Sequence, residues 1–142
     1  ISDKIRTPEV SMNASKVSAI PEVRKFLFGL QKKIAAENNI IMDGRDIGTT
    51  ILPDADVKIY LTASSLTRAR RRYLEYQEKG EACDLAEIQK TIEERDQRDM
   101  TREISPLCQA EDAVLVDSSE LTIDETVEKI LSVYHFKVSE KE

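Results

Sequence analysis

The amino-acid sequence predicts an α/β domain in which helices flank a mostly parallel sheet. Three long segments carry apolar residues at three- and four-residue spacing, and short apolar runs stand between the predicted helices. Strands that alternate with helices are typical of parallel sheets, because a crossover must return the chain before the next strand begins. The 142 residues suffice for one domain, and a hydrophobic content of 40% suffices for a core.

Each predicted element has its own local signal. Pro21 suits the first turn of a helix that ends near Glu37, with Ser18 as a possible N-cap. Three further helices begin at capping residues and are predicted over 65–79, 84–102 and from 122 or 124 onward. Short apolar runs between turn residues predict strands at 40–42, 57–61 and 113–116. Residues 1–16 are polar without a clear period and are expected to be rich in loops.

Composition narrows the classes of partner. The formal net charge of −6 argues against a protein that wraps nucleic acid or lies on an anionic membrane. No apolar run approaches the roughly 20 residues of a membrane-spanning helix. Cys83 and Cys108 belong to no C-x-x-C pair, so we expect neither a disulfide framework nor a zinc site, and we expect a cytoplasmic location.

The first candidate site is one face of the predicted helix 84–102. Its apolar stripe includes Ile88 and Ile92, and the same spacing continues to Arg95, Asp99 and Arg102. A face that begins in a core and ends as Arg-Asp-Arg indicates an anion or nucleotide site. The alternative is a solvated helix with ion pairs between successive turns.

Two more clusters of charged residues are candidate ligand-binding sites. Asp43-Gly44-Arg45-Asp46 follows a predicted strand, and ligands of parallel sheets bind beyond the carboxyl ends of strands. An ordinary turn with a capping Asp is the alternative.

The segment 67–72 holds four arginines, of which Arg68, Arg71 and Arg72 share a helical face. Arginine suits polyphosphate, whereas a solvated basic face and a nucleic-acid site are the alternatives.

The combined motifs resemble the bacterial cytidylate kinase family, within the P-loop nucleoside monophosphate kinases. The resemblance covers most of the chain and is carried by the segments 15–19, 21–24, 43–49, 53–61, 94–99 and 117–119. It implies a P-loop kinase-like fold with a short helical lid, ATP with Mg²⁺, and transfer of the ATP γ-phosphoryl group to CMP or dCMP. A UMP or AMP kinase, an inactive nucleotide-binding module and a purely structural protein are the alternatives.

The resemblance also assigns residues. It implies that Ser15, Arg24 and Asp46 contact cytosine, and that Arg45 and Arg102 hold the monophosphate. The sugar or phosphates would be reached by Arg95 and Asp99. The resemblance implies three further groups: Asp43 orienting Mg²⁺ through water; Arg70, Arg71 and Arg95 contacting ATP from the lid; and Arg45, Arg95, Arg102 and Asp43 acting in catalysis.

One family motif is absent from this sequence. The glycines stand at positions 29, 44, 48 and 80, and none belongs to a G-x-x-x-x-G-K-[ST] loop for ATP phosphates. We therefore expect one incomplete kinase domain, inactive alone and without the first strand. Its expected parts are the monophosphate-binding region 1–38, the core 39–67 and 103–142, and the lid 68–102. The longer protein is expected to be a monomer, whereas this chain can self-associate.

Overall fold

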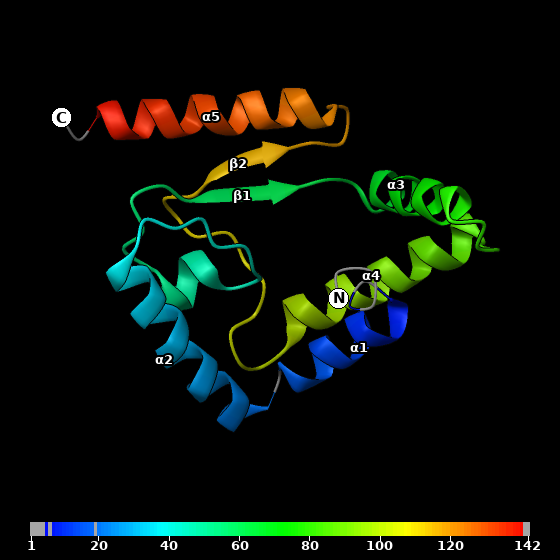
Figure 1. The fold of residues 1–142 in the computed structure, drawn as a ribbon, viewed down its shortest axis with the longest axis horizontal. Coiled ribbons are helices and arrows are strands. Elements are labelled where there is room, and N and C mark those ends of the chain that lie inside the picture. Colours follow the sequence, from blue (N-terminus) through cyan, green and yellow to red (C-terminus); the bar gives the residue numbers. More distant parts are fainter. Residues whose placement is uncertain (1–4, 6, 19, 141–142) are drawn as a thin grey trace. The chain divides into compact units, whose positions relative to one another are not determined.

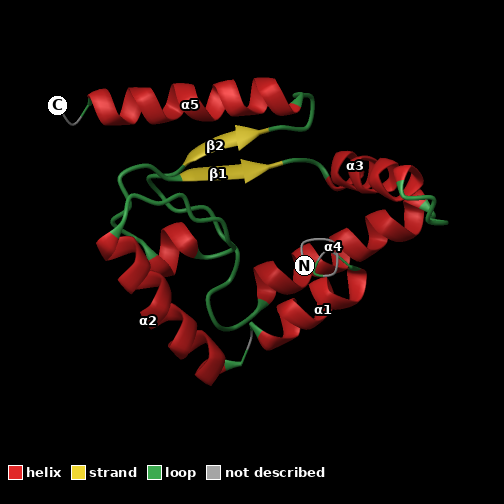
Figure 2. Ribbon diagram, viewed as in Figure 1, coloured by secondary structure: helices red, strands yellow, loops and turns green. Residues whose placement is uncertain are grey.

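The structure is a computed structural model that describes residues 5, 7–18 and 20–140 (Figure 1). The chain divides into two compact units, Ile1–Asp43 and Gly44–Glu142. Helices predominate in both units, and the strands lie in the second (Figure 2). Among the described residues, no helix is both long enough and apolar enough to cross a membrane.

The first unit contains two helices, α1 (Pro8–Val17) and α2 (Pro21–Glu37). Helix α2 confirms the prediction, but the expected loop over 1–16 is wrong where α1 forms. The physical reason is local: the Thr7 hydroxyl accepts a hydrogen bond from the Val10 amide, and Pro8 occupies the first turn. Ser18 caps the end of α1, so its predicted role as the N-cap of α2 is also wrong.

The predicted strand at 40–42 does not form. These residues have no regular secondary structure, and the Ile41 side chain is fully exposed. An apolar run becomes a strand only when a neighbouring strand accepts and donates its backbone hydrogen bonds. In the described part of the chain, the sheet contains two strands, and neither pairs with this run.

The second unit is built on a small parallel sheet. Strand β1 (Ile59–Thr62) pairs with β2 (Val114–Asp117), in a register that places Ile59 opposite Val114. Both strands lie within two residues of their predicted positions. The crossover between them contains α3 (Ser65–Glu78) and α4 (Leu85–Thr101), and α5 (Ile123–Ser139) then runs beside β2 (Figures 1 and 2).

The helix ends follow their predicted signals. Side chains of Ser64, Asp84 and Thr122 accept hydrogen bonds from the third amide of α3, α4 and α5, respectively. Gly80 follows α3 at a φ of 71°, a left-handed conformation that glycine adopts without strain. These caps fix where α4 begins and therefore which of its residues face α3.

The α3–α4 pair has its own small core. Ala69, Ile88 and Ile92 are buried together, and half-buried Tyr73 and Tyr76 pack against them. A short π-helix, Ile47–Ile51, precedes the sheet and was not predicted. Two carboxylates of this unit, Asp46 and Asp99, are also buried. Buried carboxylates require partners, and those partners define the candidate site.

Candidate functional site

The polar end of helix α4 is the centre of the candidate site. Ile88, Ile92 and Asp99 are all buried, as the helical spacing predicts. The Asp99 side chain is a carboxylic acid, yet the residue is only 4% exposed. The apolar stripe therefore continues into a carboxylate that the fold withdraws from water.

Asp99 binds two arginines through one oxygen. Arg45 Nε donates a hydrogen bond to Asp99 Oδ2 at 3.1 Å, and Arg95 Nε lies 3.7 Å from the same atom. Burial, followed by the nearby Arg45 guanidinium, lowers the pKa of Arg95, and Asp99 opposes that shift. One carboxylate thus holds two guanidinium groups close together, which leaves positive charge for an anion.

A second buried pair lies between the predicted Asp-Gly-Arg-Asp turn and the end of α4. Arg102 Nη2 lies 3.9 Å from Asp46 Oδ1, and both side chains are largely buried. Arg102 Nε also donates a hydrogen bond to the Ser105 carbonyl at 2.7 Å. Arg45–Asp99 and Arg102–Asp46 together join two segments that the sequence analysis treated as separate clusters.

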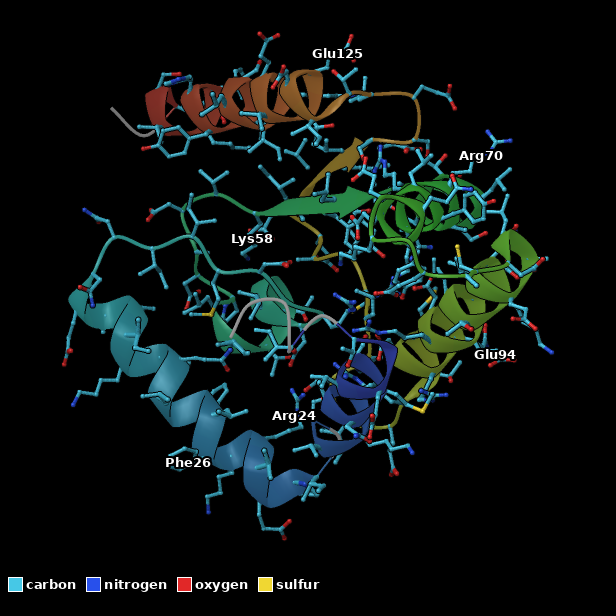
Figure 3. The ribbon with its side chains drawn as sticks, turned by 45° about the vertical axis from the view of Figure 1, so that its right-hand side comes forward. Arg24, Phe26, Lys58, Arg70, Glu94 and Glu125 are labelled. Carbon is cyan, nitrogen blue, oxygen red and sulfur yellow. The ribbon has the colours of Figure 1, made fainter. Side chains whose placement is uncertain are left out.

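Lys58 anchors the segment that follows Asp46. A Cβ atom on Gly48 would lie 3.4 Å from Lys58 Cδ, so the aliphatic chain of Lys58 covers the π-helix at that point. Lys58 is labelled in Figure 3. Its ammonium group donates to the Pro53 carbonyl and lies 2.8 Å from Asp112 Oδ2. The hydrogen bond from Lys58 lowers the pKa of Asp112. Lys58 therefore ties residues 48–53 to the start of β1.

The arginines of α3 do not act as one patch. Arg68 donates to both carboxylate oxygens of Asp96 and to the Ala63 carbonyl. Arg71 donates to the Ser118 carbonyl at 2.6 Å and to the Leu121 carbonyl at 3.2 Å. The remaining two differ in exposure: Arg70 is exposed (Figure 3) and Arg72 is half-buried.

Three predicted site residues belong to the first unit. Ser15 lies on α1, where its carbonyl accepts a hydrogen bond from the Ser18 hydroxyl at 2.9 Å. Arg24 lies on α2 and donates to the Ser18 carbonyl at 3.4 Å (Figure 3). Asp43 ends this unit and is exposed. The other seven predicted residues belong to the second unit.

The donor set for a magnesium ion is sparse. The described residues contain no group of three His, Cys, Asp or Glu side chains that would hold a metal. Mg²⁺ usually keeps several waters and takes one or two carboxylates together with substrate phosphates. A single exposed carboxylate such as Asp43 fits that mode of binding, and a cage formed by protein alone does not.

Three polar residues at the site were not assigned a role from the sequence. In the sequence analysis, Asp96 fell only within the predicted helix 84–102, Lys58 only within a predicted strand, and Arg72 only on a basic face. Their partners lie far away along the chain: Lys58 and Asp112 are 54 positions apart, and Arg68 and Asp96 are 28 apart. Spacing within one helix does not reveal such pairs.

Comparisons with known proteins agree on one family. A profile described as cytidylate kinase matches residues 1–136. The cytidylate kinase of Alkaliphilus metalliredigens is 52% identical over 137 residues, covering 96% of this chain and 62% of the relative. That of Desulfitobacterium hafniense is 51% identical over 138 residues, covering 97% of this chain and 60% of the relative. The chain thus spans about three-fifths of the length of the curated relatives it matches.

Proposed function

The chain belongs to the cytidylate kinase family, and on that premise we propose that it forms part of an enzyme that phosphorylates CMP or dCMP from ATP. The products are CDP and dCDP. The observation that carries the proposal is the pair of linked ion-pair clusters, Asp46–Arg102 and Arg45–Asp99–Arg95. They bring a buried acceptor and several cationic donors together in one unit.

Asp46 is proposed to recognise the cytosine ring. A carboxylate accepts hydrogen bonds, and cytosine offers an exocyclic amine that donates them. Uracil has a carbonyl oxygen at that position, so Asp46 would face another acceptor and UMP would bind more weakly. Asp46 is 6% exposed, which makes an unpaired contact costly. Ser15 and Arg24 are proposed as further cytosine contacts from the family resemblance alone.

The guanidinium groups are proposed to hold the phosphate. Arg45 and Arg102 each have donors beyond those used in their ion pairs, and a guanidinium fork matches two phosphate oxygens. Arg95 shares Asp99 with Arg45 and adds a third positive charge. Asp99 is itself an acceptor for a sugar hydroxyl. These side chains would orient CMP so that a phosphate oxygen points at the donor.

Catalysis in this proposal relies on positioning and charge. Phosphoryl transfer needs no covalent intermediate on the protein, and cationic groups stabilise charge on the transferred group. Arg45, Arg95 and Arg102 are the proposed catalytic cations, and Arg70 and Arg71 are proposed to meet ATP from a lid over 68–102. When bound, Mg²⁺ would neutralise charge on ATP, and Asp43 would orient one of its waters.

These residues do not include the glycine-rich loop that would cradle the ATP phosphates. The 142-residue chain alone is therefore expected to bind CMP without measurable transfer of phosphate from ATP. Formation of CDP from ATP and CMP by this chain would contradict that part of the proposal.

Calorimetric titration of the purified chain with CMP, dCMP and UMP tests the nucleotide assignment. We expect CMP and dCMP to bind, and UMP to bind at least about tenfold more weakly, because one unpaired buried acceptor costs about 1–3 kcal/mol. Binding of all three with equal affinity would refute the role of Asp46. Absence of binding by any cytosine nucleotide would refute the proposed function.

A further inference from the structure

We propose that Ser105 is a positioning residue, whose backbone carbonyl fixes the Arg102 guanidinium in the orientation that binds the phosphate of CMP. The inference rests on the proposed function, which gives Arg102 a phosphate contact, and it adds a residue that the family resemblance did not assign. Two observations carry it. The Ser105 carbonyl lies close to Arg102 Nε, and Ser105 has an unusual backbone conformation.

The Arg102 side chain is held by two acceptors at unequal distances. Its Nε donates a hydrogen bond to the Ser105 carbonyl at 2.7 Å, whereas its Nη2 lies 3.9 Å from Asp46 Oδ1. The second distance exceeds that of a hydrogen bond, so the carbonyl is the contact that fixes direction. A guanidinium is planar, and a bond at Nε therefore sets the plane in which the Nη donors lie. The side chain is 14% exposed, so water offers few alternative acceptors.

The backbone of Ser105 departs from two local preferences. Its φ is 49°, and within the part of the chain that the structure describes, no other residue with a side chain has a positive φ. This left-handed conformation is costly for a residue with a Cβ atom. The next residue is Pro106, and a residue before proline ordinarily prefers an extended backbone. Surrounding contacts must therefore hold Ser105 in this conformation.

The turn after α4 supplies those contacts. The Leu107 amide donates to the Asp99 carbonyl at 2.8 Å, so the chain folds back over the last turn of the helix. The Arg102 amide donates to the Arg98 carbonyl at 3.0 Å, which keeps Arg102 at the helix end. Between these two bonds the chain reverses, and the left-handed Ser105 directs its carbonyl toward Arg102 Nε. The strained backbone is thus linked to the orientation of a side chain proposed to bind phosphate.

Calorimetric titration with CMP tests this role through substitutions that separate backbone conformation from the hydroxyl group. Ser105→Thr keeps the hydroxyl, but a β-branched residue strongly disfavours a positive φ. We expect this variant to bind CMP about tenfold more weakly, as for the loss of one charge-assisted hydrogen bond. Ser105→Gly and Ser105→Ala should bind within about twofold of wild type, because neither is β-branched and the contact uses the carbonyl. Ile104→Thr places the same residue at an exposed neighbour without a positive φ and should leave the affinity unchanged.

A double variant tests whether Ser105 acts through Arg102. Arg102→Lys keeps a positive charge but removes the Nε donor, so it should weaken CMP binding by itself. Adding Ser105→Thr to Arg102→Lys should cause less than about a twofold further loss, because the contact that threonine disturbs is already absent. A purely structural role would reduce the affinity by the same factor in both backgrounds.

Nuclear magnetic resonance gives a second measurement that does not depend on the folding of Ser105→Thr. The Nε–H signal of Arg102, identified by its absence in Arg102→Lys, should exchange slowly with water in the wild type and in Ser105→Gly. Rapid exchange of this signal in the folded wild type overturns the proposal.

The outcomes separate this inference from the proposed function. The role of Ser105 alone is overturned if Ser105→Thr binds CMP as the wild type does, or if Ser105→Ala loses as much affinity as Ser105→Thr. It is also overturned if the effect of threonine persists in full beside Arg102→Lys. Failure of the wild type to bind CMP overturns the proposed function and this inference with it.

Discussion

Replacing Asp99 by Asn tests the electrostatic centre of the site. Asp99 Oδ2 accepts a hydrogen bond from Arg45 Nε at 3.1 Å and lies 3.7 Å from Arg95 Nε. Asparagine keeps the size of the side chain and one acceptor oxygen but removes the negative charge. The two guanidinium groups would then repel each other across a position that is 4% exposed.

The expected loss of stability follows from the burial of the three groups. A charge-assisted hydrogen bond contributes about 1.5–3 kcal/mol. The Arg45 and Arg95 side chains are 38% and 35% exposed, so water screens part of the lost attraction. We therefore expect Asp99→Asn to lower the free energy of unfolding by about 1.5 kcal/mol. With a urea slope of about 2 kcal/mol per molar, the midpoint would fall by roughly 0.7 M.

Tyrosine fluorescence during urea unfolding is the matching assay. All four tyrosines stand after residue 44, so the signal reports the second unit, which contains Asp99. Glu94→Gln is the matched control, because Glu94 is exposed on the same helix and should change the free energy by less than about 0.5 kcal/mol. Equal midpoints for Asp99→Asn and Glu94→Gln would refute the role of Asp99 as a shared counter-ion.

Three further predictions concern the second unit. Gly80→Ala should lower the free energy of unfolding by about 1 kcal/mol, because alanine is strained at a φ of 71°, and an unchanged thermal midpoint would contradict this. Arg68→Asp and Asp96→Arg should each destabilise the α3–α4 pair, and the double variant should recover most of the loss; purely additive effects would contradict direct pairing. Hydrogen bonds from Thr122 lower the pKa of Glu125. The stabilisation that ionised Glu125 gives the folded state is therefore present above the ordinary pKa of 4.5, and it is lost as the pH falls through the lowered pKa of the folded state. In acid titrations followed by circular dichroism, Glu125→Gln should weaken this dependence of stability on pH. Identical unfolding of the variant and the wild type at low pH would contradict this role of Glu125.

Local signals in the sequence predicted most of the helices. Caps such as Ser64, Asp84 and Thr122 act on an amide three residues away, so their effect is readable without the fold. Thr7 gives the same capping signal before α1, but the helix was not predicted because the surrounding segment is polar and has no clear apolar period. The prediction of a strand at 40–42 was wrong for the opposite reason. A strand depends on a partner strand that is distant in the sequence, and composition alone does not show whether that partner exists.

The candidate site was predictable in its parts. The stripe through Ile88 and Ile92 indicated that Asp99 would face inward, and the structure buries it. The pairing of Arg45 with Asp99 joins residues 54 positions apart and depends on the packing of the whole unit. The arginines of α3 do not act together because Arg68 and Arg71 bind different partners and Arg70 is exposed, which a helical projection does not show.

Cytosine recognition by Asp46 is tested most directly by the ratio of CMP to UMP affinity in Asp46→Asn. The amide of asparagine can donate to the uracil carbonyl, so we expect the preference for CMP to disappear and UMP to bind at least as well. The exposed Asp54→Asn serves as a control that should keep the wild-type ratio. An unchanged CMP preference in Asp46→Asn, measured by calorimetry, would contradict the central claim.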